Sequence, residues 1–174
     1  MAKRTWAIDP THSEVQFKIR HLMITNVTGS FDIFQASVET EDEDFSKAKV
    51  SFTTDVDSIN TGNEQRDGHL KAPDFFDAAA FPQIKFVATK TESVDNDGSY
   101  DLYGDLTIRD VTKDVKFAVV YGGTAKDQQG NTKAGFGATT TINRLDYNIK
   151  YDPTGAGVAK DVTINLNLEF VQAK

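Results

Sequence analysis

A regular alternation of apolar and polar residues is the feature that most constrains this fold. Near the end of the chain, apolar side chains occupy every second position from Val162 to Phe170. Because successive side chains of an extended strand point to opposite faces, the pattern predicts a strand with one buried face. The same period recurs along the chain, for example in Val15–Ile19, Ala48–Phe52, Ile84–Ala88 and Phe136–Ile142.

The number and spacing of these segments predict a closed antiparallel sheet. There are about eight of them, joined mainly by hairpin-sized connections, and we find no linker or internal repeat. Long unpaired sheet edges promote aggregation, and closing the sheet removes them. We therefore expect one all-β domain over residues 1–174, an antiparallel barrel of about eight strands. A two-sheet sandwich is the structural alternative.

Local irregularities in the alternation predict departures from regular strands. The apolar phase slips at Phe34, which predicts a bulge or strong bend after a loop rich in Thr and Asn. Gly104 lies inside a strand-like segment and indicates a bend or a close approach of another group. Residues 143–160 lack the alternation, contain Pro153, and are expected to form a long loop.

One segment does not follow the strand pattern. Residues 64–71 hold five ionisable side chains, and the aromatic pair Phe75-Phe76 follows. We expect a short helical insertion around residues 61–77, which ends its first helix near Gly68. It either seals one end of the barrel as a hydrogen-bonded structure or contacts a ligand, and the two roles are compatible. The candidate N-cap residues are Asn60, Thr61 and Asn63.

The composition excludes several classes of partner. The chain has 19 basic and 26 acidic residues, a net charge of −7, which argues against binding nucleic acid. No apolar segment approaches the roughly 20 residues that a membrane-spanning helix needs. The N-terminal residues lack the apolar core of a secretory signal, so we expect a cytoplasmic protein, or a periplasmic one if a leader has been removed. The absence of cysteine excludes disulfides and thiolate chemistry.

Candidate catalytic residues are few. The histidines His12, His21 and His69 do not show the spacing of a helical zinc pair. Glu64 and Asp67 lie near His69, but charge pairing along a short helix explains them more simply. We therefore expect no catalytic set, no metal and no enzyme. A small-substrate or metal-dependent enzyme that uses these histidines is one alternative, and a ligand-free, stress-linked structural module is another.

Several motifs along the chain match the pattern of one protein family. The most specific are Asn63-Glu64-Gln65-Arg66-Asp67 and, shortly after, Pro73-Asp74-Phe75-Phe76-Asp77. On these motifs the chain resembles the YceI-like family of bacterial lipocalin-like proteins along nearly its whole length. The supporting residues are Trp6, Asp9 and His12-Ser13; Val15, Phe17 and His21-Leu22; Gly29 and Phe31; His69-Leu70; Phe81-Pro82, Ile84 and Phe86; and Gly104, Leu106-Thr107-Ile108-Arg109, Val111 and Thr112.

The resemblance implies a lipocalin-like barrel around a long apolar cavity that binds polyisoprenoids, such as isoprenoid quinones or prenyl phosphates. It also implies a homodimer. Burying one five-carbon isoprene unit contributes on the order of 3 kcal/mol before ordering costs. The hydrocarbon part of such a lipid would therefore bind with little help from its head group. We expect non-enzymatic lipid binding, for transport or storage, with the lipid as the bound ligand and no other cofactor.

The expected cavity wall consists of apolar residues on one face of the strands, with two from the insertion. These are Val15, Phe17, Ile19, Val50, Phe52, Ile84, Phe86, Leu106, Ile108, Phe117, Phe136, Ile164, Leu166 and Leu168, together with Phe75 and Phe76. Arg66 and His69 are the candidates for contacts with a polar head at the mouth.

Overall fold

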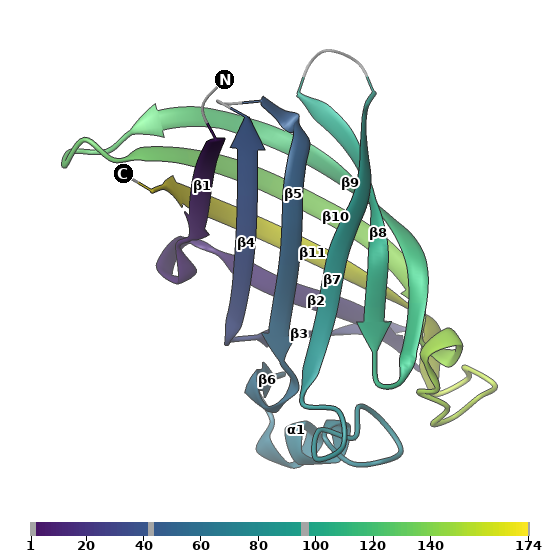
Figure 1. The fold of residues 1–174 in the computed structure, drawn as a ribbon. Helices are drawn as coiled ribbons and strands as arrows, with labels where there is room; N and C mark the ends of the chain where they lie inside the picture. Colours follow the sequence, from purple (N-terminus) through teal and green to yellow (C-terminus); the bar gives the residue numbers. More distant parts are fainter. Residues whose placement is uncertain (1–2, 42–43, 95–97, 174) are drawn as a thin grey trace.

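The fold is an antiparallel barrel with one short helix at its lower end (Figure 1). The computed structural model describes residues 3–41, 44–94 and 98–173. The strands are β1 (Lys3–Ile8), β2 (Glu14–His21), β3 (Thr25–Phe31), β4 (Phe34–Glu41), β5 (Asp44–Asp55), β6 (Ile59–Asn60), β7 (Gln83–Ser93), β8 (Ser99–Ile108), β9 (Val111–Lys126), β10 (Thr132–Asn143) and β11 (Val158–Gln172). The helices are α1 (Glu64–Leu70) and the 3-10 turns η1 (Pro10–His12), η2 (Val56–Ser58) and η3 (Arg144–Tyr147).

The strands form one sheet that closes on itself. Its order is β1-β4-β5-β7-β8-β9-β10-β11, and β11 pairs directly with β1, so eight strands make a closed ring. The long strand β11 pairs with β1 near Phe170 and with β2 farther down, from Asn167 to Val158. The predicted barrel is confirmed, and the sandwich alternative is wrong because no second sheet is present among the described residues.

Two details between Thr25 and Phe34 differ from the sequence prediction. The segment rich in Thr and Asn is not a loop, because Thr25–Phe31 forms β3 and pairs with β2. The phase change at Phe34 is not a bulge within a strand, because β3 ends at Phe31 and β4 begins at Phe34. The two apolar phases therefore belong to different strands.

The predictions for Gly104 and the long loop are confirmed. A Cβ on Gly104 would lie 2.5 Å from both the Phe86 ring and the carbonyl oxygen of Val87, so only glycine permits this close approach. Between Asn143 and Val158 the chain forms η3 followed by an irregular segment, as expected for a loop.

Helix α1 begins after a side-chain cap and ends close to the predicted residue. Asn63 is its N-cap, since the side-chain Oδ1 accepts a hydrogen bond from the backbone N–H of Arg66 at 3.0 Å. The helix continues past Gly68 to Leu70, slightly beyond the predicted end. No helix in the described part of the chain has the length and apolar character needed to cross a bilayer.

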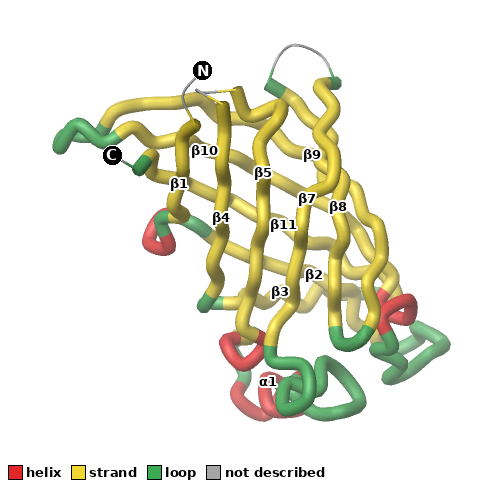
Figure 2. Tube along the Cα trace, viewed as in Figure 1, coloured by secondary structure: helices red, strands yellow, loops and turns green. Residues whose placement is uncertain are grey.

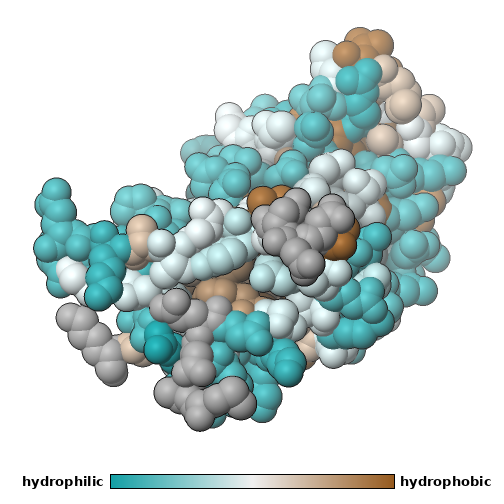
Figure 3. All heavy atoms as spheres, turned by 90° about the horizontal axis from the view of Figure 1, so that it is seen from above, coloured by the Kyte–Doolittle hydropathy of each residue, from teal (hydrophilic) through white to brown (hydrophobic). Residues whose placement is uncertain are grey.

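The ends of the barrel are covered in different ways. At the lower end, α1 and the turns that follow it lie across the strands (Figures 1 and 2). We call residues 61–82 the lid. At the opposite end, where β4 and β5 adjoin, buried aromatic side chains including Trp6, Phe45 and Phe170 pack together. Seen from above, apolar residues are visible in a hollow between mainly polar rims (Figure 3).

Candidate functional site

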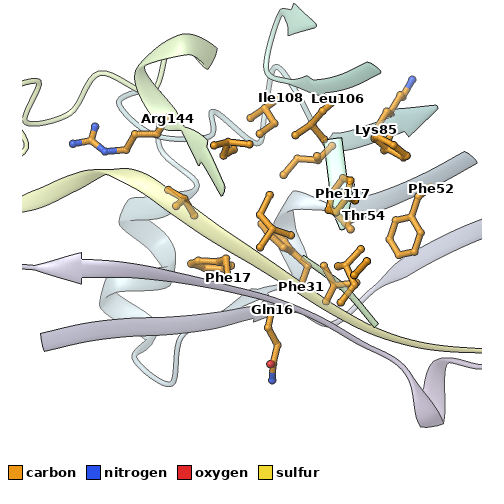
Figure 4. A pocket seen from close by; sticks show the side chains of 18 of the residues that line it. Gln16, Phe17, Phe31, Phe52, Thr54, Lys85, Leu106, Ile108, Phe117 and Arg144 are labelled. Atoms are coloured by element: carbon orange, nitrogen blue, oxygen red, sulfur yellow. The ribbon is translucent and has the colours of Figure 1, made fainter. Parts of the chain in front are cut away.

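The inward faces of the strands enclose a cavity of about 460 Å³. This volume lies within the range of about 300–1,000 Å³ that is common for small-molecule sites. Phe17, Phe31, Phe52 and Phe117 point into the same space from different strands (Figure 4). The cavity extends from the lid toward the aromatic side chains at the opposite end, because Phe45 and Phe76 both line it.

Every residue that the sequence predicted for the cavity wall or the mouth lines this cavity, from Val15 on β2 to Leu168 on β11. Arg66, His69, Phe75 and Phe76 line it from the lid. The structure therefore brings all of these residues together in space. Their contact with a ligand stays a prediction.

Sequence reasoning missed part of the lining. Val119, Ala138 and Val162 follow the same two-residue period as the predicted residues and could have been found from it. Ile149 and Tyr151 come from the loop before β11, which carries no periodic signal. Strand alternation alone therefore identifies the barrel wall but not the residues that close its ends.

The described lining residues are almost entirely apolar or basic. They include no aspartate, glutamate, serine or cysteine, although the chain as a whole has a net charge of −7. The polar ends of Gln16 and Lys85 point away from the cavity (Figure 4). Thr54 is 5% exposed, and its buried hydroxyl has no hydrogen-bond partner in the described structure. A buried hydroxyl without a partner is unfavourable, so a ligand group that accepts or donates a hydrogen bond would be stabilised there.

Arg144 closes the cavity beside the lid and is only 2% exposed. Its Nε and Nη atoms donate hydrogen bonds to the carbonyl oxygens of Ile149, Tyr151, Asp152, Val158 and Ala159. Burial lowers the pKa of this guanidinium, and the charge of Asp152 opposes that effect. The side chain therefore fixes the loop between β10 and β11 around a buried positive charge.

The lid is held by its own polar side chains. The Asp67 carboxylate accepts hydrogen bonds from the backbone N–H of Thr61 at 2.9 Å and from its hydroxyl at 2.5 Å. Arg66 donates from Nε to the Thr61 hydroxyl and from Nη2 to the Thr61 carbonyl, both at 2.8 Å. Arg109, in the turn between β8 and β9, donates to the carbonyl oxygens of Pro73 and Phe75. The dense charges of this segment thus have a structural role.

An aromatic contact joins the lid to the loop before β11. The His69 ring lies edge-on to Phe75 and to Tyr151, with centroid distances of 4.9 and 5.2 Å. Phe75 and Tyr151 are 4.7 Å apart, and His69 Nε2 lies 2.8 Å from an Asp74 oxygen. These contacts are made by side chains, and His69 and Tyr151 are exposed while Phe75 is buried, so this seam can separate without loss of a strand pairing.

The three histidines do not form one metal site. In the described residues, the one group that could hold a metal is Asp9, His12 and Glu169, which excludes His21 and His69. Lys133 Nζ lies 3.6 Å from the Asp9 carboxylate and 3.3 Å from that of Glu169, so a positive charge already offsets part of the negative charge of the cluster. Hydrogen bonds from Thr11 and His12 hold the pKa of Asp9 well below its usual value.

Comparison with known proteins identifies the family. The YceI-like domain family matches residues 6–170. The chain belongs to the YceI-like family. A UPF0312 protein of Staphylococcus aureus is 39% identical over 170 residues, which cover 95% of this YceI-like chain and 96% of that protein.

Solved structures share the barrel. A YceI protein of Campylobacter jejuni is 32% identical, with a TM-score of 0.78 and coverage of 90% of this chain and 91% of that one. BcnA of Burkholderia cenocepacia has a TM-score of 0.84 at 23% identity, over 93% and 98% of the two chains. A polyisoprenoid binding domain from Saccharophagus degradans has a TM-score of 0.72 at 15% identity, over 97% and 98%. The last two likenesses show the fold alone.

Proposed function

We propose that this protein binds one polyisoprenoid, or another long-chain amphiphilic lipid, inside its barrel. The observation that carries the proposal is the cavity of about 460 Å³ with an apolar, aromatic-rich wall. Each buried methylene contributes about 0.8 kcal/mol, so a branched hydrocarbon chain gains most of its affinity from such a wall. The name of the Saccharophagus degradans domain, which has the same fold, supports this ligand class.

The chemistry of the lining favours binding over catalysis. The described lining residues include no carboxylate, serine or cysteine. The described histidines of the lining, His21 and His69, make no hydrogen bond to a hydroxyl or amine that could serve as a nucleophile. We therefore infer a carrier or storage role rather than an enzyme.

A cavity-filling substitution tests the proposal. Ala138 lines the cavity, whereas its neighbour Thr139 is exposed and faces outward. We expect Ala138→Phe to weaken binding of geranylgeraniol at least tenfold, measured by fluorescence titration, because the added ring occupies the ligand's space. Thr139→Phe adds the same ring outside and should leave affinity unchanged. Equal affinity of both variants and the unaltered protein would contradict binding in the barrel. Lipid extraction followed by mass spectrometry identifies the natural ligand.

A further inference from the structure

The turn between β2 and β3 exposes consecutive aliphatic side chains. Leu22, Met23 and Ile24 are 54%, 59% and 70% exposed. We call these residues the hairpin tip. The other large exposed apolar residues in the described chain, such as Val87 and Val120, are isolated in the sequence, and single ones are ordinary on a protein surface.

The backbone of the hairpin tip is unfavourable for the residues it contains. Leu22 and Met23 have φ values of 52° and 59°, in the left-handed region, and Ile24 N donates to His21 O at 3.1 Å to close the turn. Glycine and asparagine are the residues that adopt this conformation readily. If these positions served only to form the turn, Asn-Gly would suit them better than Leu22-Met23. Aliphatic residues that adopt a backbone conformation unfavourable to them and yet stay more than half exposed suggest a role outside the folded chain.

The hairpin tip lies beside the lid end of the cavity. Leu22 N donates to the carbonyl oxygen of Gly157 at 2.7 Å, which places the tip against the loop before β11. His21, which directly precedes the tip, lines the cavity, as does Val27 on the following strand. The half-exposed Tyr151 of the same loop also lines the cavity and contacts the lid. The exposed aliphatic groups therefore lie next to residues that line the cavity.

The charge of the hairpin differs from that of the chain. Residues 15–31 contain Lys18 and Arg20 and no aspartate or glutamate, in a protein of net charge −7. Arg20 Nη2 donates to the Met23 carbonyl at 2.9 Å, so this cation stays next to the tip. On the neighbouring strand, the exposed Lys160 and Asp161 offset each other in charge. Aliphatic groups with adjacent cations match the surface of a bilayer that contains anionic lipids.

We propose that the hairpin tip docks on such a bilayer and brings the cavity mouth to the membrane, where the bound lipid is exchanged. Three side chains of one turn fall far short of the roughly 1,000 Å² that a stable protein interface buries, but they suffice to anchor a turn among lipid headgroups. The exchange step rests on the proposed lipid-binding function. The docking step does not.

Vesicle flotation of the full chain tests the docking. The triple variant Leu22→Asn, Met23→Gly and Ile24→Ser replaces the tip with residues that suit the turn, so the fold is retained. We expect the unaltered protein to float with vesicles of equal phosphatidylcholine and phosphatidylglycerol, and the triple variant to bind at least fivefold less. Val120→Ser, an equally exposed substitution on β9, should bind like the unaltered protein. Equal binding of the triple variant, or no binding of the unaltered protein, would overturn the proposal.

The outcomes separate docking from cavity binding and from self-association. If geranylgeraniol binds the unaltered protein in solution but the vesicles do not, the docking fails and the proposed function stands. If the vesicles bind through the tip but geranylgeraniol does not enter the cavity, the docking stands and the proposed function fails. If the triple variant is monomeric, the unaltered protein is dimeric by light scattering, and neither binds vesicles, the tip joins two copies and the docking proposal is overturned.

Discussion

The two ends of the barrel are built in different ways. At the end opposite the lid, Trp6 and Phe45 lie 5.0 Å apart by ring centroid, and Phe45 contacts Phe136 at 4.9 Å. These rings belong to strands of the closed ring itself. At the lid end, a separate segment is attached by hydrogen bonds from Asp67, Arg66 and Arg109 and by the contact of His69 with Tyr151.

The difference indicates which end opens. Moving the buried Trp6 requires the sheet itself to deform, because its strand β1 is paired with β11 on one side and with β4 on the other. The lid and the loop before β11 can move without breaking a strand pairing of the closed ring, because their side-chain hydrogen bonds can be exchanged for bonds to water; the main cost is exposure of the buried Phe75. We therefore expect a lipid to pass at the lid end, and substitutions at the two ends to separate stability from exchange.

The largest effect should follow from Trp6→Ala. Trp6 is 1% exposed, and its Nε1 donates to the Thr40 hydroxyl at 3.0 Å. Removing a buried aromatic side chain leaves a cavity and lowers the free energy of unfolding by about 3–5 kcal/mol. Urea denaturation measures this change. Trp6→Phe keeps most of the packing and should cost clearly less; a similar loss for both variants would mean that the hydrogen bond, and not the packing, holds this end.

Arg144→Met should have a smaller and more local effect. It removes the donors for the carbonyl oxygens of the loop before β11, including those of Tyr151 and Val158. Hydrogen bonds to charged groups contribute about 1.5–3 kcal/mol each, but carbonyls near the surface regain water, so we expect a total loss of about 3 kcal/mol. Amide hydrogen exchange at Gly157 and Val158 should accelerate, while exchange around Trp6 should not. Arg144→Lys keeps the charge without the five-donor geometry and should behave like Arg144→Met.

The sequence predicts those features of the two barrel ends and of the wall between them whose signal lies in neighbouring residues of the chain, and it misses the others. The barrel wall follows from the two-residue period, because alternation is a property of neighbouring positions. Strand β3 was missed since Gly29 stands where an inward apolar residue would be expected. A Cβ there would lie 2.5 Å from the Phe17 ring, so the partner strand supplies the missing apolar group. The role of Arg144 was also hidden, because its partners are backbone carbonyls, which no side-chain pattern reveals.

At the lid, Asp67→Ala should affect exchange more than global stability. The carboxylate accepts both hydrogen bonds from Thr61 that fix the start of the lid. We expect a loss of about 1–2 kcal/mol in unfolding free energy, together with a several-fold faster release of a preloaded fluorescent lipid. Asp67→Asn retains an acceptor oxygen and should lie between the two, and the exposed Glu64→Gln serves as a surface control. Unchanged release in Asp67→Ala would show that the lid does not limit exchange.

Thr54→Val should produce the smallest effect, and one of opposite sign. Thr54 lines the cavity and its buried hydroxyl has no hydrogen-bond partner, so the isosteric methyl group removes a desolvation cost and should raise the free energy of unfolding of the empty protein by about 1 kcal/mol. The neighbouring Thr53 faces the other side of β5, and Thr53→Val should leave stability nearly unchanged. Because a ligand group can supply the missing hydrogen-bond partner, the variant should also discriminate ligands. A lipid whose carbonyl or hydroxyl reaches this depth should bind less tightly, and a pure hydrocarbon chain should not. A loss of stability in Thr54→Val would mean that the hydroxyl already has a partner in the empty barrel.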